Sequence, residues 1–249
     1  MNLAERSISV TTGRCAVVIE LCGLPGSGKT TLAHALLDRL RESGMLAEAV
    51  DGPVSAAAPR HRRLPRKAIL VGRAFVTHPR AQAHAARLVG SGQPSNRDML
   101  AMSVRWSVAQ QLLDQARRSG SGAAVLEEGL LQALWSAGLR TRSASVPDLV
   151  GLASTTARPD VVVHLDVPVE LALERLRSRT SQHSRVQQLG RAEQLAEMQR
   201  GDALLRGLLT EWRRRGFGQV IEVNAAAHSS GQADVPVAVL KRLRAGVRR

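Results

Sequence analysis

One eight-residue segment constrains the fold of this chain more than any other feature. Residues 23–30 read GLPGSGKT and fit the pattern GxxxxGK(S/T) at every fixed position. A short apolar run rich in β-branched residues (16–22) precedes the segment, and apolar residues at helical spacing follow it between positions 31 and 41. A strand, a glycine turn and a helix in this order place free backbone N–H groups where they bind phosphate oxygens. The segment therefore predicts a nucleotide site in an α/β fold.

The lysine and the threonine at the end of this segment carry the chemistry of the expected site. The residues expected to contact the phosphates are Gly23, Leu24, Pro25, Gly26, Ser27, Gly28, Lys29, Thr30 and Thr31. Lys29 can reach the β- and γ-phosphates and act in catalysis, and the Thr30 hydroxyl can ligate Mg²⁺. Only three of the 35 basic residues are lysines, so a lysine at position 29 is informative, because arginine does not replace its compact ammonium. The expected cofactors are ATP or GTP, with Mg²⁺.

The composition argues against several other classes of protein. A net charge of +14 would suit nucleic acid, but nearly all basic residues are arginines spread along the chain, and few aromatic rings are present for base stacking. We therefore expect no nucleic-acid partner. No apolar stretch reaches the roughly 18–20 residues of a membrane span, and residues 1–14 lack the apolar core of a signal peptide. With only two cysteines, Cys15 and Cys22, we expect a cytoplasmic protein with reduced thiols.

The rest of the chain alternates β-type and helical segments. After the first strand, strands are expected at 46–50, 123–127, 161–166 and 219–223. Helices are expected at 31–41, 68–89, 97–118, 169–178, 187–215 and 235–244. Five strands buried between helices predict a three-layer α/β/α fold with a parallel sheet, in one domain at 15–249 preceded by a flexible segment at 1–14. The Pro- and Arg-rich segment 53–67 is interpreted as a loop.

A phosphate loop works with a carboxylate that holds Mg²⁺ or accepts a proton. Glu127 and Glu128 end the third expected strand, at the edge where ligands of parallel sheets bind. Because adjacent strand residues point to opposite faces, only one of them faces the phosphates; we favour Glu127 as metal ligand or base and place Glu128 on the substrate side. The alternative is that both are turn residues facing solvent. Asp51 ends the second strand and either binds a substrate hydroxyl or forms an ordinary Asp-Gly turn.

A group of arginines follows the fourth expected strand: Arg175, Arg177, Arg179 and Arg185. The spacing of Arg175 and Arg179 predicts that they share one helix face. A transferred phosphoryl group spreads charge over its oxygens, and donors on a closing segment stabilise that charge while excluding water. We therefore expect Arg175 and Arg179 to act in catalysis from a lid at about 175–192. The alternative is a solvated basic face.

These residues together resemble the P-loop kinases of nucleosides and nucleotides, with thymidylate kinase as the nearest pattern. The segments that carry the resemblance are 19–31, 99–118 followed by 125–129, 158–176 and 220–225. The resemblance implies a sheet order of 2-3-1-4-5 with a helical segment on the substrate side. It also implies that Arg105 contacts the substrate and that Arg175 and Arg179 lie near the lid arginines.

Two features depart from the thymidylate kinase pattern. Ala101 stands where that family has an aromatic residue that stacks on the base. The pair Glu127-Glu128 stands where that family has Asp-Arg, so an anion replaces a cation. An acidic site without a stacking ring suits a neutral or hydroxylated acceptor better than thymidylate.

Three functions are compatible with these observations. The leading hypothesis is an ATP- and Mg²⁺-dependent kinase of a nucleoside, nucleotide or hydroxylated metabolite, acting without a membrane and compatible with a homodimer. An alternative is a P-loop ATPase or nucleotide switch that regulates a protein partner, because residues 124–128 also read as a variant Walker B strand. A minor alternative is a kinase directed at nucleic acid, motivated by the basic segments 60–67 and 241–249.

Overall fold

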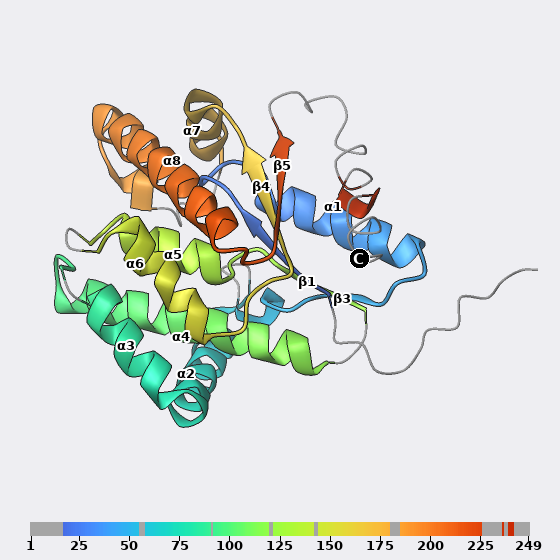
Figure 1. The fold of residues 1–249 in the computed structure, drawn as a ribbon. Coiled ribbons are helices and arrows are strands. Elements are labelled where there is room, and N and C mark those ends of the chain that lie inside the picture. Colours follow the sequence, from blue (N-terminus) through green and yellow to red (C-terminus); the bar gives the residue numbers. More distant parts are fainter. Residues whose placement is uncertain are drawn as a thin grey trace, which may run out of the picture.

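The chain folds around a parallel sheet (Figure 1). The computed structural model describes residues 17–54, 58–90, 92–119, 122–141, 144–179, 185–225, 236 and 239–241. The strands found there are β1 (Val17–Cys22), β2 (Ala47–Ala49), β3 (Ala123–Leu126), β4 (Val161–Asp166) and β5 (Gln219–Asn224). Their order is β2-β3-β1-β4-β5, and every neighbouring pair is parallel. The predicted fold class and strand order are confirmed.

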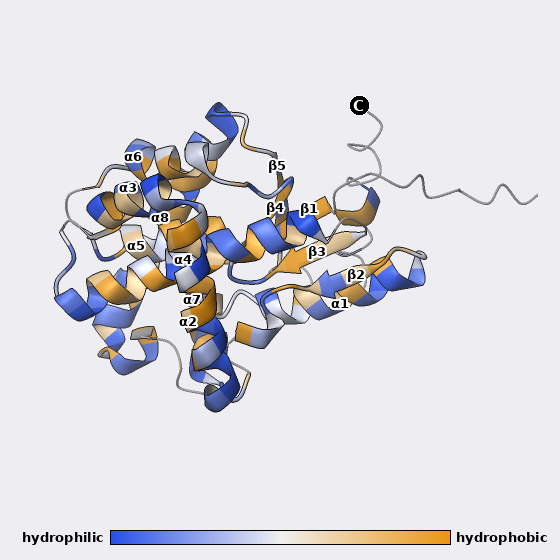
Figure 2. Cartoon of the chain, turned by 90° about the horizontal axis from the view of Figure 1, so that it is seen from below, coloured by the Kyte–Doolittle hydropathy of each residue, from blue (hydrophilic) through white to orange (hydrophobic). Residues whose placement is uncertain are grey.

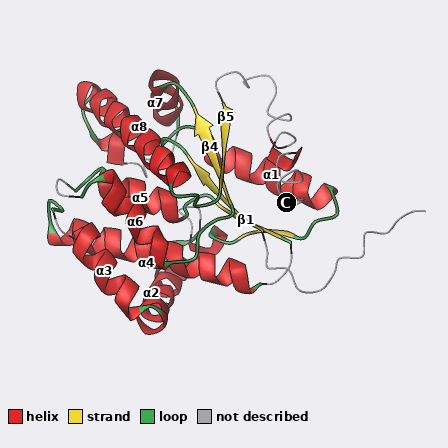
Figure 3. Ribbon diagram, viewed as in Figure 1, coloured by secondary structure: helices red, strands yellow, loops and turns green. Residues whose placement is uncertain are grey.

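Helices cover both faces of this sheet (Figure 3). The α-helices are α1 (Lys29–Glu42), α2 (Arg60–Thr77), α3 (Pro79–Gly90), α4 (Asn96–Arg118), α5 (Leu130–Gly138), α6 (Val146–Leu152), α7 (Val169–Arg177) and α8 (Arg191–Arg214). Short 3-10 helices are η1 (Gly52–Val54), η2 (Ala153–Thr155) and η3 (Arg185–Gln188). Helix α1 lies on one side of the sheet, and α4, α5 and α8 lie on the other (Figure 1).

Alternate residues of the central strand β1 face two different cores. Ile19 and Leu21 belong to a hydrophobic cluster with α1. Val18 and Cys22 belong to a larger cluster with α4, α5 and α8. Glu20 lies between Val18 and Cys22, and it is 0% exposed. Because side chains alternate along a strand, β1 carries a carboxylate into the larger core.

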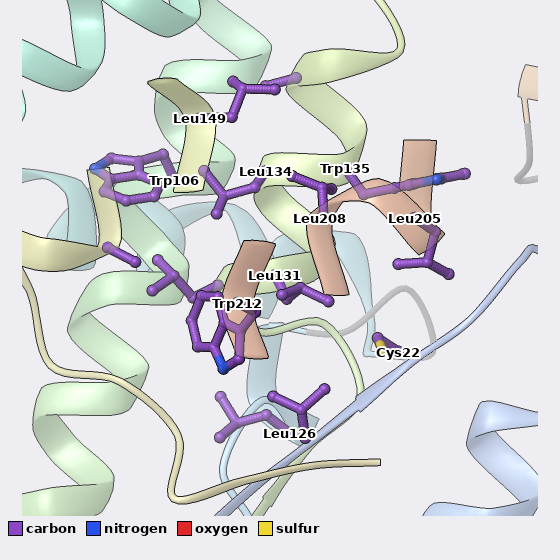
Figure 4. Packing of buried hydrophobic residues seen from close by; sticks show 14 of the residues in the cluster. Cys22, Trp106, Leu126, Leu131, Leu134, Trp135, Leu149, Leu205, Leu208 and Trp212 are labelled. Atoms are coloured by element: carbon purple, nitrogen blue, oxygen red, sulfur yellow. The ribbon is translucent and has the colours of Figure 1, made fainter. Parts of the chain in front are cut away.

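Large side chains from the helices fill this larger core. Trp212 of α8 and Leu131 of α5 point toward Leu126 of β3 (Figure 4). Hydrophobic residues run along β3 and β4, whereas α1 mixes hydrophilic and hydrophobic positions (Figure 2). This pattern is typical of strands buried on both faces and of a helix with one solvated face. None of the described helices is both long and apolar enough to cross a membrane.

The predicted strands agree with the observed ones to within one residue, and β4 agrees at both ends. The prediction of a loop at 53–67 is wrong from Arg60 onward, because α2 begins there. Pro65 lies in the second turn of α2, where it removes one backbone hydrogen bond without ending the helix. The predicted helix 68–89 is two helices, since Pro79 forces the preceding residue, His78, out of the helical conformation.

Other helix predictions also need correction. The predicted helix 187–215 begins only at Arg191. Helices α5 and α6 lie in a stretch for which no element was predicted. Of the predicted closing helix 235–244, residues 236 and 239–241 are described and helical, and Val239 is buried in the cluster with α1. The segment predicted as flexible, 1–14, lies outside the described residues.

Candidate active site

Two glycines with left-handed backbone conformations shape the loop between β1 and α1. Gly26 has a φ of 88° and Gly28 a φ of 95°, which residues with a Cβ rarely adopt. A Cβ on Gly26 would lie 2.1 Å from the backbone oxygen of Ala172 in α7. Helix α1 begins at Lys29, so its first N–H groups are directed to this loop. The backbone therefore has the form expected of an anion-binding turn.

The polar side chains of the loop fit a phosphate group. The Lys29 ammonium donates hydrogen bonds to the backbone oxygens of Gly23 at 2.7 Å and Leu24 at 3.1 Å. Desolvation by the surrounding loop lowers the pKa of Lys29 to about 8. The Ser27 hydroxyl is buried and has no hydrogen-bond partner among the described residues. A constrained cation next to an unpaired hydroxyl suits the oxygens of a polyphosphate.

The loop is joined to the end of β3 by one side-chain contact. The Thr30 hydroxyl donates a hydrogen bond of 2.6 Å to Oε2 of Glu127. A hydroxyl and a carboxylate are both hard oxygen ligands of the kind that Mg²⁺ binds. Of the two adjacent glutamates, Glu127 is thus the one in contact with the loop.

Asp51 makes contacts that the sequence did not indicate. Its Oδ2 accepts hydrogen bonds from the backbone N–H groups of Glu127 at 2.8 Å and Glu128 at 2.9 Å. Burial raises the pKa of Asp51 to about 6, although these two hydrogen bonds oppose the shift. Asp51 therefore fixes the backbone that carries both glutamates.

A cavity adjoins the same turn on the side of α2 and α4. Its volume is about 270 Å³, and it is open to solvent. The residues that line it are Asp51, Val54, Lys67, Ala101, Val104, Arg105, Val108, Leu112 and Glu128. Three of them, Asp51, Arg105 and Glu128, were assigned to substrate binding from the sequence. No aromatic ring belongs to this lining, and Ala101 occupies the wall where the resemblance implies a stacking residue.

The charged groups around the cavity interact with each other and with the loop. The Arg105 guanidinium donates a hydrogen bond of 2.6 Å to the Ser136 hydroxyl. Partial burial lowers the pKa of Lys67, while the nearby Glu128 carboxylate opposes this shift. The charge of Glu128 also acts on Lys29. Glu128 therefore lies between the cavity and the loop. Lys67 was missed because its segment was interpreted as a loop.

The structure separates the two arginines predicted to share a helix face. Helix α7 ends at Arg177, so Arg179 lies beyond the helix and the predicted shared face is wrong. Arg179 is nevertheless close enough to Lys29 to lower the pKa of that ammonium. Arg177 donates a hydrogen bond of 2.9 Å to Gln194 of α8. Part of the predicted lid, residues 180–184, lies outside the described residues.

A sequence profile of one protein family covers most of this structure. The family is described as "AAA domain", and the match extends over residues 18–204, about three quarters of the chain. The chain belongs to this AAA-domain family. The match includes the loop, the sheet strands β1 to β4, the cavity and most of α8.

Local similarity to curated proteins is confined to short segments. Adenylyl-sulfate kinase from Rippkaea orientalis is 53% identical over 38 residues, which are 15% of this chain and 21% of the relative. Probable adenylyl-sulfate kinases from Aeropyrum pernix and Synechocystis are 48% identical over 46 residues and 55% identical over 38 residues. These matches cover 17% of this chain and 25% of the relative for Aeropyrum pernix, and 15% and 22% for Synechocystis.

The chain therefore spans between a fifth and a quarter of the length of these curated relatives. The short matches to these relatives, together with the family match, support the broad prediction that the chain belongs to the P-loop nucleotide kinase superfamily. The narrower resemblance to thymidylate kinase stays a prediction.

One buried carboxylate of this AAA-domain protein was not singled out from the sequence. Oε1 of Glu20 accepts a hydrogen bond of 3.0 Å from the backbone N–H of Gln132 in α5. Burial is the main cause that raises the pKa of Glu20 to about 7; the neighbouring charge of Asp51 contributes to this shift, and the hydrogen bonds from backbone N–H groups of α5 oppose it. The sequence did contain a signal for this residue, which is a glutamate in the middle of the apolar run 17–22. A charged side chain is rarely buried without a specific partner, so its position in a buried strand indicates that such a partner exists.

This carboxylate makes stability depend on pH. Because the pKa of Glu20 rises from 4.5 to about 7 on folding, the folded state favours the protonated form, and stability falls as the pH rises through 4.5 to 7. Glu20→Gln removes this dependence. We expect the variant to gain about 2–3 kcal/mol over the wild type between pH 5 and pH 8. Urea unfolding of both proteins across this range measures the difference in the free energy of unfolding, and subtraction removes the titration of groups that do not interact with Glu20. A difference in the free energy of unfolding that is the same at every pH in this range would contradict the prediction.

Proposed function

We propose that this protein is a P-loop kinase that transfers the γ-phosphoryl group of ATP to a hydroxyl of a small molecule. The main observation that supports this proposal is the position of two consecutive residues directly after β3. Glu127 accepts the hydrogen bond of Thr30 in the loop, and Glu128 lines the adjacent cavity. A donor site and an acceptor site would then meet at one turn, as phosphoryl transfer requires.

On the donor side, the loop N–H groups bind the phosphates and Lys29 stabilises the charge on the transferred group. Thr30 and Glu127 would hold Mg²⁺, which when bound neutralises phosphate charge. Arg179 acts on Lys29 electrostatically, which supports a place beside the phosphates. Arg175 lies in the last turn of α7, the helix whose Ala172 packs against Gly26. We assign both arginines to stabilisation of the transferred group.

On the acceptor side, the cavity combines two carboxylates, Asp51 and Glu128, with two cations, Lys67 and Arg105. Glu128 would accept a hydrogen bond from the acceptor hydroxyl, and the hydrogen bond of its backbone N–H to Asp51 supports this role because it fixes the backbone at Glu128. The cations suit an acceptor that also carries an acidic group. The absence of a ring from the lining favours an acceptor that is not held by base stacking.

A screen of ATP consumption tests this proposal. The purified protein is incubated with ATP, Mg²⁺ and candidate acceptors, and products are identified by mass spectrometry. The candidates are nucleosides, nucleotides, adenylyl sulfate, sugars and hydroxylated acids. We expect at least one acceptor to gain one phosphoryl group. ATP hydrolysis that rises with a protein partner, with no phosphorylated acceptor, would replace the proposal with the ATPase alternative.

A further inference from the structure

The turn that carries Glu127 and Glu128 is held by carboxylates from two other parts of the chain. Asp51, which follows β2, binds the N–H groups of residues 127 and 128. Glu20, in the centre of β1, binds the N–H of residue 132, and the N–H groups of residues 130 and 131 also act on its carboxylate. Five backbone donors within residues 127–132 are thus directed at two buried acceptors.

Helix α5 receives its N-terminal cap from β1. The N-cap residue, Gly129, has no side chain, and α5 has no acidic residue in its first turn. The first N–H groups of a helix need acceptors when they are buried. Here Glu20 supplies the acceptor across 112 residues of sequence, and its carboxyl group faces the positive end of the helix.

Gly129 is packed directly against the Glu20 carboxyl group. A Cβ on Gly129 would lie 2.4 Å from Cδ of Glu20 and 2.6 Å from Oε2. The φ of Gly129 is −93°, which any residue can adopt, so the side chain of Glu20 and not the backbone angle excludes a Cβ here. Glu20 therefore sets how closely the turn approaches β1.

We propose that Glu20 is a positioning residue, which holds the turn 127–132 so that Glu127 meets Thr30 while Glu128 faces the cavity. Glu20 is not among the residues that line the cavity, and its hydrogen bonds come from backbone N–H groups at the start of α5. A buried carboxylate costs free energy that a hydrophobic residue of similar size would not. The hydrogen bonds of this carboxyl group to the start of α5 offset that cost, since they fix the turn that carries Glu127 and Glu128. A displacement of about 1 Å in a reacting group can lower a rate about 10²-fold. The inference rests on the proposed function for its effect on catalysis.

Hydrogen exchange and steady-state kinetics of three variants test the inference. Glu20→Ala removes the acceptor, Glu20→Gln keeps one carbonyl oxygen at the same place, and Val18→Ala is the control on the same face of β1. In Glu20→Ala we expect the amides of residues 130–132 to exchange at least about 10-fold faster and kcat to fall about 10- to 100-fold. The KM for ATP should change less than about 3-fold. Glu20→Gln should restore kcat to within about 5-fold of the wild type.

A second pair of variants covers the case in which Glu20→Ala does not fold. Gly129→Ala places a methyl group against Glu20 and should lower kcat at least about 10-fold. Combined with Glu20→Ser, which also shortens the side chain, it should lower kcat by less than the product of the single effects, because the contact between the methyl group and the Glu20 carboxyl group has been removed.

The outcomes separate the inference from the proposed function. Unchanged exchange at residues 130–132 in Glu20→Ala, or effects equal to those of Val18→Ala, would overturn the positioning role. Strictly multiplicative effects of the paired variants would also overturn it. A wild-type protein that phosphorylates no acceptor would overturn the proposed function, while the exchange data would still decide whether Glu20 holds the turn.

Discussion

Lys29→Ala is expected to lower kcat for phosphoryl transfer about 10³-fold. Lys29 is held at the loop by the backbone oxygens of Gly23 and Leu24, and these contacts leave its charge where the transferred phosphoryl group would lie. Removal of one preorganised charged donor typically costs 10²- to 10³-fold or more in phosphoryl transfer. The measurement is initial rate of product formation at saturating ATP and acceptor, with ATP binding followed by calorimetry.

Lys29→Arg is the matched control for the shape of the cation. It keeps the charge, but a planar guanidinium cannot take the place of a compact ammonium between two carbonyl oxygens. We expect it to recover at most about one tenth of the lost activity. Because the loop desolvates Lys29 and lowers its pKa, the alanine variant should unfold at a temperature no lower than the wild type. A wild-type rate in Lys29→Ala would remove the basis of the proposed kinase.

The strands could be predicted because their signal is local. The apolar, β-branched runs at β1 and β4 are buried on both faces, so the apolar pattern and burial agree along both strands except at the polar residues Glu20 and His164, which are also buried. The region around α2 failed for the opposite reason. Its two prolines gave similar signals, but Pro65 lies inside a helix, whereas Pro79 begins a new one. Helices α2 and α3 both pack against α4, and such tertiary packing is not visible in a short window of sequence.

The candidate site shows the same division between local and distant information. The phosphate-binding loop could be predicted because its residues are consecutive in the sequence. Strand alternation reduced the second carboxylate to Glu127 or Glu128, and the hydrogen bond from Thr30, 97 residues away, identifies which one meets the loop. The function of Glu20 was hidden because its partner, the start of α5, lies in a segment for which no helix was predicted.

Glu127→Gln and Glu128→Gln are expected to affect different kinetic constants. Glu127 contacts Thr30 and is assigned to Mg²⁺, so its loss should lower kcat about 10²- to 10³-fold and raise the Mg²⁺ concentration needed for half-maximal rate. Glu128 lines the cavity, so its loss should raise the KM for the acceptor about 10-fold with less than a 3-fold change in the KM for ATP. Glutamine keeps the size of each side chain and removes only the charge.

Glu42→Gln at the far end of α1 is the control, since this exposed glutamate forms an ion pair with Arg39 of the same helix and should leave all constants unchanged. The division of roles depends on the bend that follows β3, where Glu127 contacts Thr30 and Glu128 lines the cavity. Asp51 holds both backbone N–H groups and therefore couples the two positions. If Glu128→Gln instead altered the Mg²⁺ dependence and Glu127→Gln the acceptor KM, the donor and acceptor sides would have to be exchanged.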